Sequence, residues 1–333
     1  GLEPGVVERA ALEAENTAFI DTDGEVIADQ WAYLNAIKRV AAAAIEQFLQ
    51  GSESPTDHQD TSSDAADDIV VPTAVTSQVS VTVSGRLFIP FTTLPAALLT
   101  FLEKRLIFLN PEYRKRERLG YSTWDTPRVL KQIESDERGI WLPAGILSEL
   151  TSFCHDHQLE LEVIDERVEG KRISATTSIQ LRPVQRAIAK SLAAHERAVL
   201  VAPPGFGKTV VVIDQIRRRK RTTLVIVHTR PLLEQWQKQL RDHLQLSKHE
   251  LGTIGASRWK VGSNVTIALY QTLARRGVDS IKDSFGFVIV DECHHVPAYT
   301  FTKVLRELPA KAVLGLTATL VRHDQLDRLI SLY

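Results

Sequence analysis

The second half of the chain alternates short, nearly continuous apolar runs with longer amphipathic stretches. Apolar runs of four to eight residues are typical of strands buried on both faces, and apolar residues at helical spacing predict helices between them. This alternation predicts an α/β fold, with a parallel sheet covered by helices on both faces. The expected strands are 197–202, 222–228, 264–269, 286–291 and 312–317, and the expected helices are 183–194, 207–220, 230–245, 271–276 and 298–307.

The first half of the chain has three different patterns. Residues 31–49 carry apolar side chains at helical spacing, whereas 51–76 contain six acidic residues and no Lys or Arg, and most of the others are Ser, Thr, Pro and Gly. Alternating residues then predict paired strands over 79–89, followed by a helix over 94–106 and a strand, a helix and a strand over 140–167. The predicted organisation is a helical segment (1–50), an acidic flexible linker (51–76), a small α/β domain (77–175) and the larger α/β domain (176–333).

Composition narrows the class of protein. The 333 residues include only two cysteines, and they contain no apolar run long enough to cross a bilayer. We therefore expect an intracellular, cytoplasmic protein without a membrane partner. The net charge of −1 means that any nucleic-acid-binding surface must be local. Because the chain contains no Met and ends within an apparent helix, we expect it to be a fragment of a longer protein.

Residues 202–209, APPGFGKT, follow the first predicted strand of the larger domain and lead into a helix. They match the phosphate-binding pattern G-x-x-x-x-G-K-[ST], with Ala202 in place of the first glycine. Glycines let backbone N–H groups turn toward an anion, and the helix N-terminus adds positive potential. Lys208 is expected to reach the β and γ phosphates and Thr209 to bind Mg²⁺. The candidate nucleotide-binding residues here are Pro204, Gly205, Phe206, Gly207, Lys208, Thr209 and Val210.

Residues 287–295, FVIVDECHH, supply the second half of this site. Four apolar residues end in adjacent carboxylates, of which Asp291 can hold Mg²⁺ and Glu292 can orient and deprotonate an attacking water. A strand that merely ends in solvated acids is the alternative. The occurrence of both motifs in the expected chain order favours the nucleotide site, with Lys208, Asp291 and Glu292 as the catalytic residues.

LRPVQ (181–185) opens the helix before the phosphate loop. The Gln185 amide can pair with adenine, and Arg182 can stack on the base or reach a phosphate; an ordinary helix start with proline in its first turn is the alternative. Other predicted strands also end in polar groups. Expected contacts with a nucleic-acid backbone are Arg230, Gln271 and Thr272, and expected links between the two sites are His294, Thr317 and Thr319. Each is also consistent with a simple polar cap.

The ordered set LRPVQ, APPGFGKT, HTRPLLEQW, ALYQTL, DECHH and LTATL resembles the first motor lobe of superfamily 2 DEAD/DEAH-type helicases, in the XPB-like and restriction-enzyme-type branch. The resemblance covers about 178–333. It implies a RecA-like ATPase that uses ATP and Mg²⁺ and tracks a nucleic acid; DNA is favoured over RNA, and the sequence leaves both open. It also implies the residue roles given above. Val184 stands where an aromatic residue is frequent, which weakens the expected stacking on the base.

A second resemblance lies upstream. FLNPEYRKRERLGYSTWDTPRVL and IWLPAGILSEL resemble the small domain that precedes the motor in primase–helicase proteins of prokaryotic TOTE conflict systems. It implies that residues 1–50 end an upstream primase domain. In residues 107–130, basic and aromatic side chains alternate, which fits either nucleic-acid binding or a solvated helix face.

Family members carry arginine fingers on a second RecA-like lobe, which this chain lacks. We therefore expect the chain alone to hydrolyse ATP slowly. The competing hypotheses are a nucleotide-sensing DNA-binding module and the motor subunit of a restriction or nuclease complex.

Overall fold

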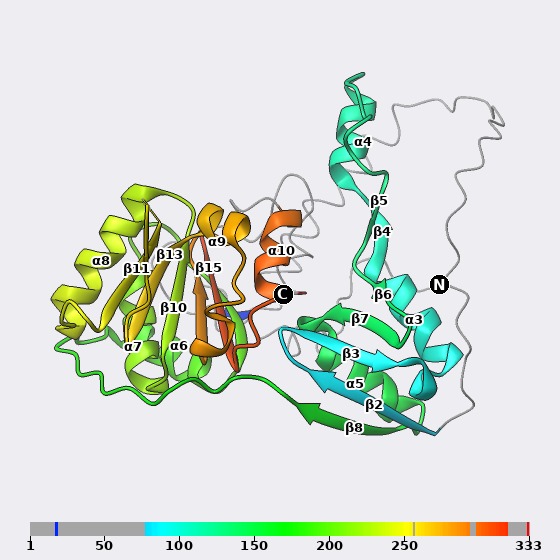
Figure 1. The fold of residues 1–333 in the computed structure, drawn as a ribbon, viewed down its shortest axis with the longest axis horizontal. Helices are drawn as coiled ribbons and strands as arrows, with labels where there is room; N and C mark the ends of the chain where they lie inside the picture. The colour runs from blue at the N-terminus through cyan, green and yellow to red at the C-terminus, as the bar shows by residue number, and fades with distance from the viewer. Residues whose placement is uncertain (1–16, 19–76, 256, 294–297, 319–331, 333) are drawn as a thin grey trace.

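The computed structural model describes residues 17–18, 77–255, 257–293, 298–318 and 332 (Figure 1). The helix predicted over 31–49 and the acidic linker predicted over 51–76 lie outside the described residues, as do His294 and Thr319. No helix in the described part of the chain is long and apolar enough to span a lipid bilayer.

An eight-stranded sheet, here called the large sheet, forms the second half of the molecule, in the order β1-β9-β15-β14-β10-β13-β11-β12. All five strands predicted from the apolar runs are present and parallel to their neighbours. Their bounds are β9 (Arg197–Val201), β10 (Thr223–Val227), β13 (Val265–Leu269), β14 (Phe287–Val290) and β15 (Ala312–Thr317). The carboxyl ends of these strands therefore meet at one edge.

Two apolar clusters cover the two faces of this sheet. In β10 and β14, alternate residues enter different clusters: Val225 and Ile289 lie in one, and Leu224 and Val288 lie in the other. The first cluster includes residues of α6 (Pro183–Ala193), α7 (Lys208–Arg219) and α8 (Arg230–Leu244), and the second includes residues of α9 (Tyr270–Arg276) and α10 (Ala298–Arg306). The predicted helices are confirmed, and the burial of both faces explains why the strands read as continuous apolar runs.

Three strands of the large sheet were not predicted. β11 (Leu251–Gly255) pairs with β13, and β12 (Arg258–Lys260) returns antiparallel along the edge. Their sequence is short and contains glycine, so it carries little periodic signal. β1 (Thr17–Ala18) pairs with β9 at the other edge, so these two residues add to the large sheet although they belong to a segment expected to close an upstream domain.

A five-stranded sheet, here called the small sheet, lies in the order β6-β7-β3-β2-β8. The predicted pair over 79–89 and the strand–helix–strand over 140–167 are confirmed. Its strands are β2 (Gln78–Val83), β3 (Arg86–Pro90), β6 (Glu134–Ser135), β7 (Gly139–Pro143) and β8 (Glu160–Asp165), packed with α3 (Ala96–Leu106) and α5 (Leu147–Asp156). Between α3 and β6 the chain leaves this body as a projecting arm, built from β4 (Ile107–Leu109), α4 (Pro111–Arg118) and β5 (Val129–Lys131) (Figure 1).

The two sheets are held together beside α10. Arg306 of α10 donates to Gln132 at 3.0 Å and forms an ion pair with Glu134. In the β2–β3 turn, a Cβ atom on Gly85 would lie 2.4 Å from the Arg306 carbonyl oxygen, so only glycine allows this approach. Lys311 and Arg167 both pair with Asp165, and the Arg167 hydrogen bond holds the pKa of that carboxyl well below its usual range. The small sheet is therefore packed directly on the element that follows Glu292.

The segment that joins the sheets also packs tightly on the large sheet. Val168 donates to the Pro309 carbonyl at 2.6 Å. Gly170 has a φ of +67°, and a Cβ atom there would lie 2.3 Å from the Gly286 nitrogen. A side chain at position 170 would thus push the connection away from the start of β14, the strand that leads to Asp291.

Gly170→Ala is expected to destabilise the protein more than Gly120→Ala. Gly120 has nearly the same φ, +68°, but nothing lies within 4 Å of its added Cβ. In both variants a residue with a Cβ atom must adopt a positive φ, which lowers the free energy of unfolding by about 1 kcal/mol. The clash at position 170 lowers it by about a further 1–3 kcal/mol. Urea unfolding of the two variants measures the difference, and equal losses would show that the connection is not tightly packed.

Candidate nucleotide-binding site

The phosphate loop joins β9 to α7 and has the backbone that its glycines allow. Gly205 and Gly207 have φ values of +82° and +90°, and Gly207 is the N-cap of α7. A Cβ atom on Gly207 would lie 2.8 Å from Nε2 of Gln185, so conformation and space both require glycine there. Pro204 and Gly205 are exposed, whereas Lys208, Thr209 and Val210 are half-buried in the first turn of α7. The loop therefore leads directly into the N-terminus of α7, where an anion can bind.

Backbone contacts fix the floor of this loop. Lys208 Nζ donates to the Ala202 carbonyl at 2.8 Å, and the Ala202 N–H donates to the Thr317 carbonyl at 3.1 Å. Thr317 is fully buried at the end of β15. The loop and the strand end that was predicted to couple the two sites are therefore in direct contact.

The start of α6 supports the loop from its other side. Gln185 Nε2 and an Arg182 guanidinium nitrogen both donate to the Phe206 carbonyl, at 2.8 and 2.5 Å. Gln185 Oε1 accepts from the Arg182 backbone N–H at 3.0 Å, and Gln185 is only 4% exposed. Both ends of the Gln185 amide thus bind protein groups. The structure gives Gln185 and Arg182 a role in holding the loop that the sequence reasoning missed, and their contact with a base stays a prediction.

Asp291 follows the central strand β14 and is 9% exposed. Its Oδ2 accepts from Trp236 Nε1 of α8 at 2.7 Å, and its Oδ1 accepts from the Glu292 backbone N–H at 3.0 Å. Burial raises the pKa of Asp291, whereas the Trp236 hydrogen bond and the charge of Lys208 act to lower that pKa. Only β15 lies between β9 and β14, and all three strands are parallel, so the fold brings the phosphate loop and Asp291 to the same edge of the large sheet.

Trp236 is the functional residue that the sequence reasoning missed. It lies on the apolar face of α8 with Leu233, Leu240 and Leu244, and is 2% exposed. A buried indole needs a partner for its N–H. This requirement was the available signal, although the sequence alone does not say which acceptor the indole meets.

Glu292 adopts a left-handed backbone, with φ of +48°, and is half-buried. This conformation is uncommon for a residue with a side chain and is frequently found at functional sites. The next residue, Cys293, donates its N–H to the Leu316 carbonyl at 2.9 Å. The chain therefore turns sharply at Glu292, directly beside the buried carboxylate.

The predicted nucleic-acid contacts lie at the same edge of the large sheet. β10 and β13 are parallel neighbours in which Val227 pairs with Leu269, so the residues that follow them are adjacent. Arg230, the first residue of α8, is exposed, as is Gln271, whose amide donates to the His228 carbonyl at 2.8 Å. Thr272 is half-buried.

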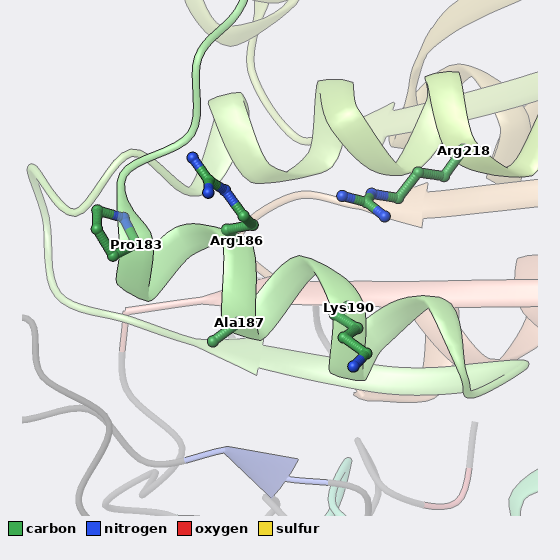
Figure 2. A pocket seen from close by; sticks show the side chains of 5 residues that line it. All are labelled: Pro183, Arg186, Ala187, Lys190 and Arg218. Carbon is green, nitrogen blue, oxygen red and sulfur yellow. The ribbon is translucent and has the colours of Figure 1, made fainter.

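A separate surface depression lies between α6 and α7, where Arg218 extends from α7 toward the side of α6 on which Arg186 lies (Figure 2). Its lining residues are Pro183, Arg186, Ala187, Lys190 and Arg218. None of these five is a predicted site residue, and Arg218 already forms an ion pair with Asp214. The depression is therefore distinct from the nucleotide site.

A parallel sheet with a phosphate loop after β9 and a carboxylate pair after β14 defines a RecA-like P-loop nucleotide-binding lobe. Residues 178–322 match the family described as the type III restriction enzyme, res subunit. The chain is 36% identical over 152 residues to the DNA 3'-5' helicase XPB of Mycobacterium tuberculosis, an alignment that covers 44% of this chain and 27% of the relative. It is 30% identical over 146 residues to the DNA 3'-5' translocase XPB2 of Sulfurisphaera tokodaii, with coverage of 44% and 32%.

The fold is also similar to that of the UvsW helicase of bacteriophage T4, with a TM-score of 0.58 at 18% identity. That alignment covers 77% of this chain and 98% of the T4 chain. The large sheet and its helices make up only about half of this chain, so the similarity extends beyond them. These matches support a superfamily 2 helicase first motor lobe, of the XPB-like and restriction-enzyme-type branch, over residues 178–322. The chain spans about a third or less of the length of the curated relatives named above.

Trp236→Phe is expected to cost stability in a pH-dependent way. The ring is kept, but Asp291 loses a hydrogen bond to its charged form, a loss of about 1.5–3 kcal/mol near neutral pH. As the pH falls through the raised pKa of Asp291, the carboxyl group takes up a proton and the penalty shrinks. Urea unfolding from neutral pH down to about pH 4 measures this change.

Trp259→Phe is the matched control. Trp259 is half-buried on β12, and its ring lies beside Arg276. The same chemical change there should give a difference in unfolding free energy that does not vary with pH. If the loss of unfolding free energy in Trp236→Phe were also independent of pH, the hydrogen bond from Trp236 to Asp291 would be contradicted.

Proposed function

We propose that this chain is the ATP-binding lobe of an ATP-dependent DNA helicase or translocase. The observation that carries the proposal is the buried carboxylate of Asp291 after β14, with the phosphate loop after β9 only two strands away at the same edge of the large sheet. The names of the relatives, DNA helicase and DNA translocase, support the same activity.

The residues present fit ATP and Mg²⁺. The loop 204–207 and the N-terminus of α7 form an anion cradle, and Lys208 adds a positive charge that can follow the β and γ phosphates. Thr209 and Asp291 offer the oxygen ligands that Mg²⁺ prefers, with the remaining positions left to phosphate and water. When bound, Mg²⁺ neutralises charge on the phosphates. Arg182 and Gln185 hold the loop in place and lie where the base is expected to bind.

Glu292 is proposed as the general base. Its left-handed backbone places a second carboxylate next to Asp291 without adding it to the strand. A carboxylate in this position can orient a water and accept its proton as the terminal phosphoryl group departs.

Arg230, Gln271 and Thr272 are proposed to contact the DNA backbone. They follow neighbouring strands and lie at one edge, and their side chains suit phosphate rather than base recognition. Thr317 contacts the phosphate loop through Ala202, which supports a coupling role for it, and we propose His294 and Thr319 as further members of this link.

Fast turnover is proposed to need a second RecA-like lobe. Arginine fingers supplied by a partner surface raise phosphoryl-transfer rates by roughly 10³–10⁵ in related systems. We expect residues 1–333 to bind Mg·ATP and to turn over slowly when no such lobe acts on them. An upstream primase domain is a further proposed partner.

Glu292→Gln is the decisive substitution. It keeps the side-chain size but removes the base, so hydrolysis should fall by at least about 100-fold while ATP binding is retained. A fluorescent ATP analogue measures binding, and phosphate release measures turnover, for the chain alone and for a version extended through a second lobe, each with single-stranded DNA, duplex DNA and RNA.

The result separates three functions. Loss of turnover with retained binding supports the motor. If the extended protein binds ATP tightly without hydrolysing it, and the variant behaves identically, the lobe is a nucleotide sensor. The match to the restriction-enzyme family favours a nuclease partner as the second alternative, and co-purification of a nuclease would support it.

A further inference from the structure

The projecting arm, residues 107–131, carries an unusual surface. Trp124 is 96% exposed, Tyr121 is 65% exposed and Leu119 is 51% exposed. Four of the seven exposed large hydrophobic residues in the described part of the chain lie on this arm, the fourth being Leu109. Clustered apolar side chains at a protein surface mark interaction sites.

Internal contacts hold the tip of the arm in one shape. Asn110 donates through Nδ2 to the Pro127 carbonyl at 2.8 Å and through its N–H to the Arg128 carbonyl at 2.9 Å. Arg116 pairs with Asp125 at 2.5 Å and donates to the Ser122 carbonyl at 3.2 Å. These bonds tie the loop that bears Trp124 to α4, so the indole is presented outward by a structured loop.

The arm is also basic, although the chain as a whole has a net charge of −1. Residues 107–131 contain six basic and three acidic side chains. Arg114, Lys115, Arg118 and Arg128 are exposed, and none of them has an ion-pair partner among the residues that the structure describes. Arg114 and Arg118 are four residues apart on α4 and so lie on one face of this helix.

We propose that this arm binds an unpaired nucleic-acid strand, with Trp124 stacking on a base and Arg114, Lys115 and Arg118 contacting its phosphates. Exposed aromatic rings beside cationic side chains are the elements by which proteins bind single strands. The faces of bases within a duplex are already covered by their neighbours, so an exposed indole on the arm is suited to stack on a base of an unpaired strand. Phosphates and base faces are common to DNA and RNA, and the test below distinguishes them. The proposal deepens the proposed motor function and gives the strand a contact remote from the nucleotide site.

The proposal is tested by measuring how tightly the 333-residue chain binds nucleic acid in the absence of ATP. Fluorescence anisotropy gives its affinity for a single-stranded DNA, for an RNA of the same sequence and for the duplex DNA. Trp124→Ala should weaken single-strand binding about tenfold, and Trp124→Phe should retain most of the affinity. Duplex binding should change little. The strand whose affinity depends on Trp124 is the one the arm takes, and no dependence for either strand would overturn the proposal.

The charged face is tested by Arg114→Gln with Arg118→Gln. Log affinity falls with log salt, and each phosphate contact to a single strand contributes about 0.7 to the steepness of that fall. The double variant should therefore make the fall less steep by about 1.4. Arg186→Gln with Lys190→Gln, on the depression beside α6, removes equal charge elsewhere and is the matched control. An equal change of slope in both double variants would show that general charge, rather than the arm, binds the strand.

Each variant is also assayed for ATP binding, which separates the two proposals. Retained ATP binding with weakened strand binding supports the arm. If the parent chain failed to bind ATP while its strand affinity still depended on Trp124, the motor function would fail and the arm would stand.

Discussion

The site depends on a carboxylate buried at the end of a central strand. Burial disfavours the charged form of Asp291 and raises its pKa. The fold limits this cost with a hydrogen bond from Trp236, a backbone N–H from Glu292 and the nearby charge of Lys208. Each of these groups comes from a different part of the nucleotide site, so the carboxylate organises α8, the turn after β14 and the phosphate loop around itself.

Strand order explains how residues far apart in sequence reach this point. β15 lies between β9 and β14, which places Thr317 beside the phosphate loop and Asp291 one strand further along. β10 and β13 follow on the other side of β14 and lead into α8 and α9, which carry Arg230 and Gln271. Because these strands are parallel, every connection that leaves a carboxyl end faces the same edge, and the motifs become neighbours without long loops.

Much of this arrangement could be predicted from the sequence. The apolar runs predicted β9, β10, β13, β14 and β15, because burial on both faces leaves a strong signal. The phosphate loop and the acidic pair could be predicted because their chemistry needs particular residue types at fixed spacing. The hydrogen bond from Trp236 to Asp291 could not, since periodicity shows that a residue is buried but not which partner it meets. The same limit applies to Gln185, whose amide could serve a base or a backbone carbonyl.

Tertiary packing decided the remaining features. The sequence pattern places Gly85 between two predicted strands and Gly286 at the start of another, yet it does not show that Gly85 lies against the Arg306 carbonyl or that Gly170 and Gly286 approach each other. Such contacts depend on how two units meet, which the pattern along either unit does not encode. β11 and β12 were missed for a related reason, because an edge hairpin takes its conformation from the strand beside it more than from its own periodicity.

One helix connects the nucleotide site to the edge where DNA is proposed to bind. α8 begins at Arg230, and Trp236 lies six residues later, about 9 Å along the axis. Arg230 and Trp236 both belong to α8. A contact at Arg230 that displaces this helix would therefore also move the Trp236 indole relative to Asp291. Loss of that hydrogen bond would favour the protonated form of Asp291, which is a poor ligand for Mg²⁺. If a strand contacts Arg230 and Asp291 holds Mg²⁺, as proposed, α8 would link the two events over a short distance and without any change in the sheet.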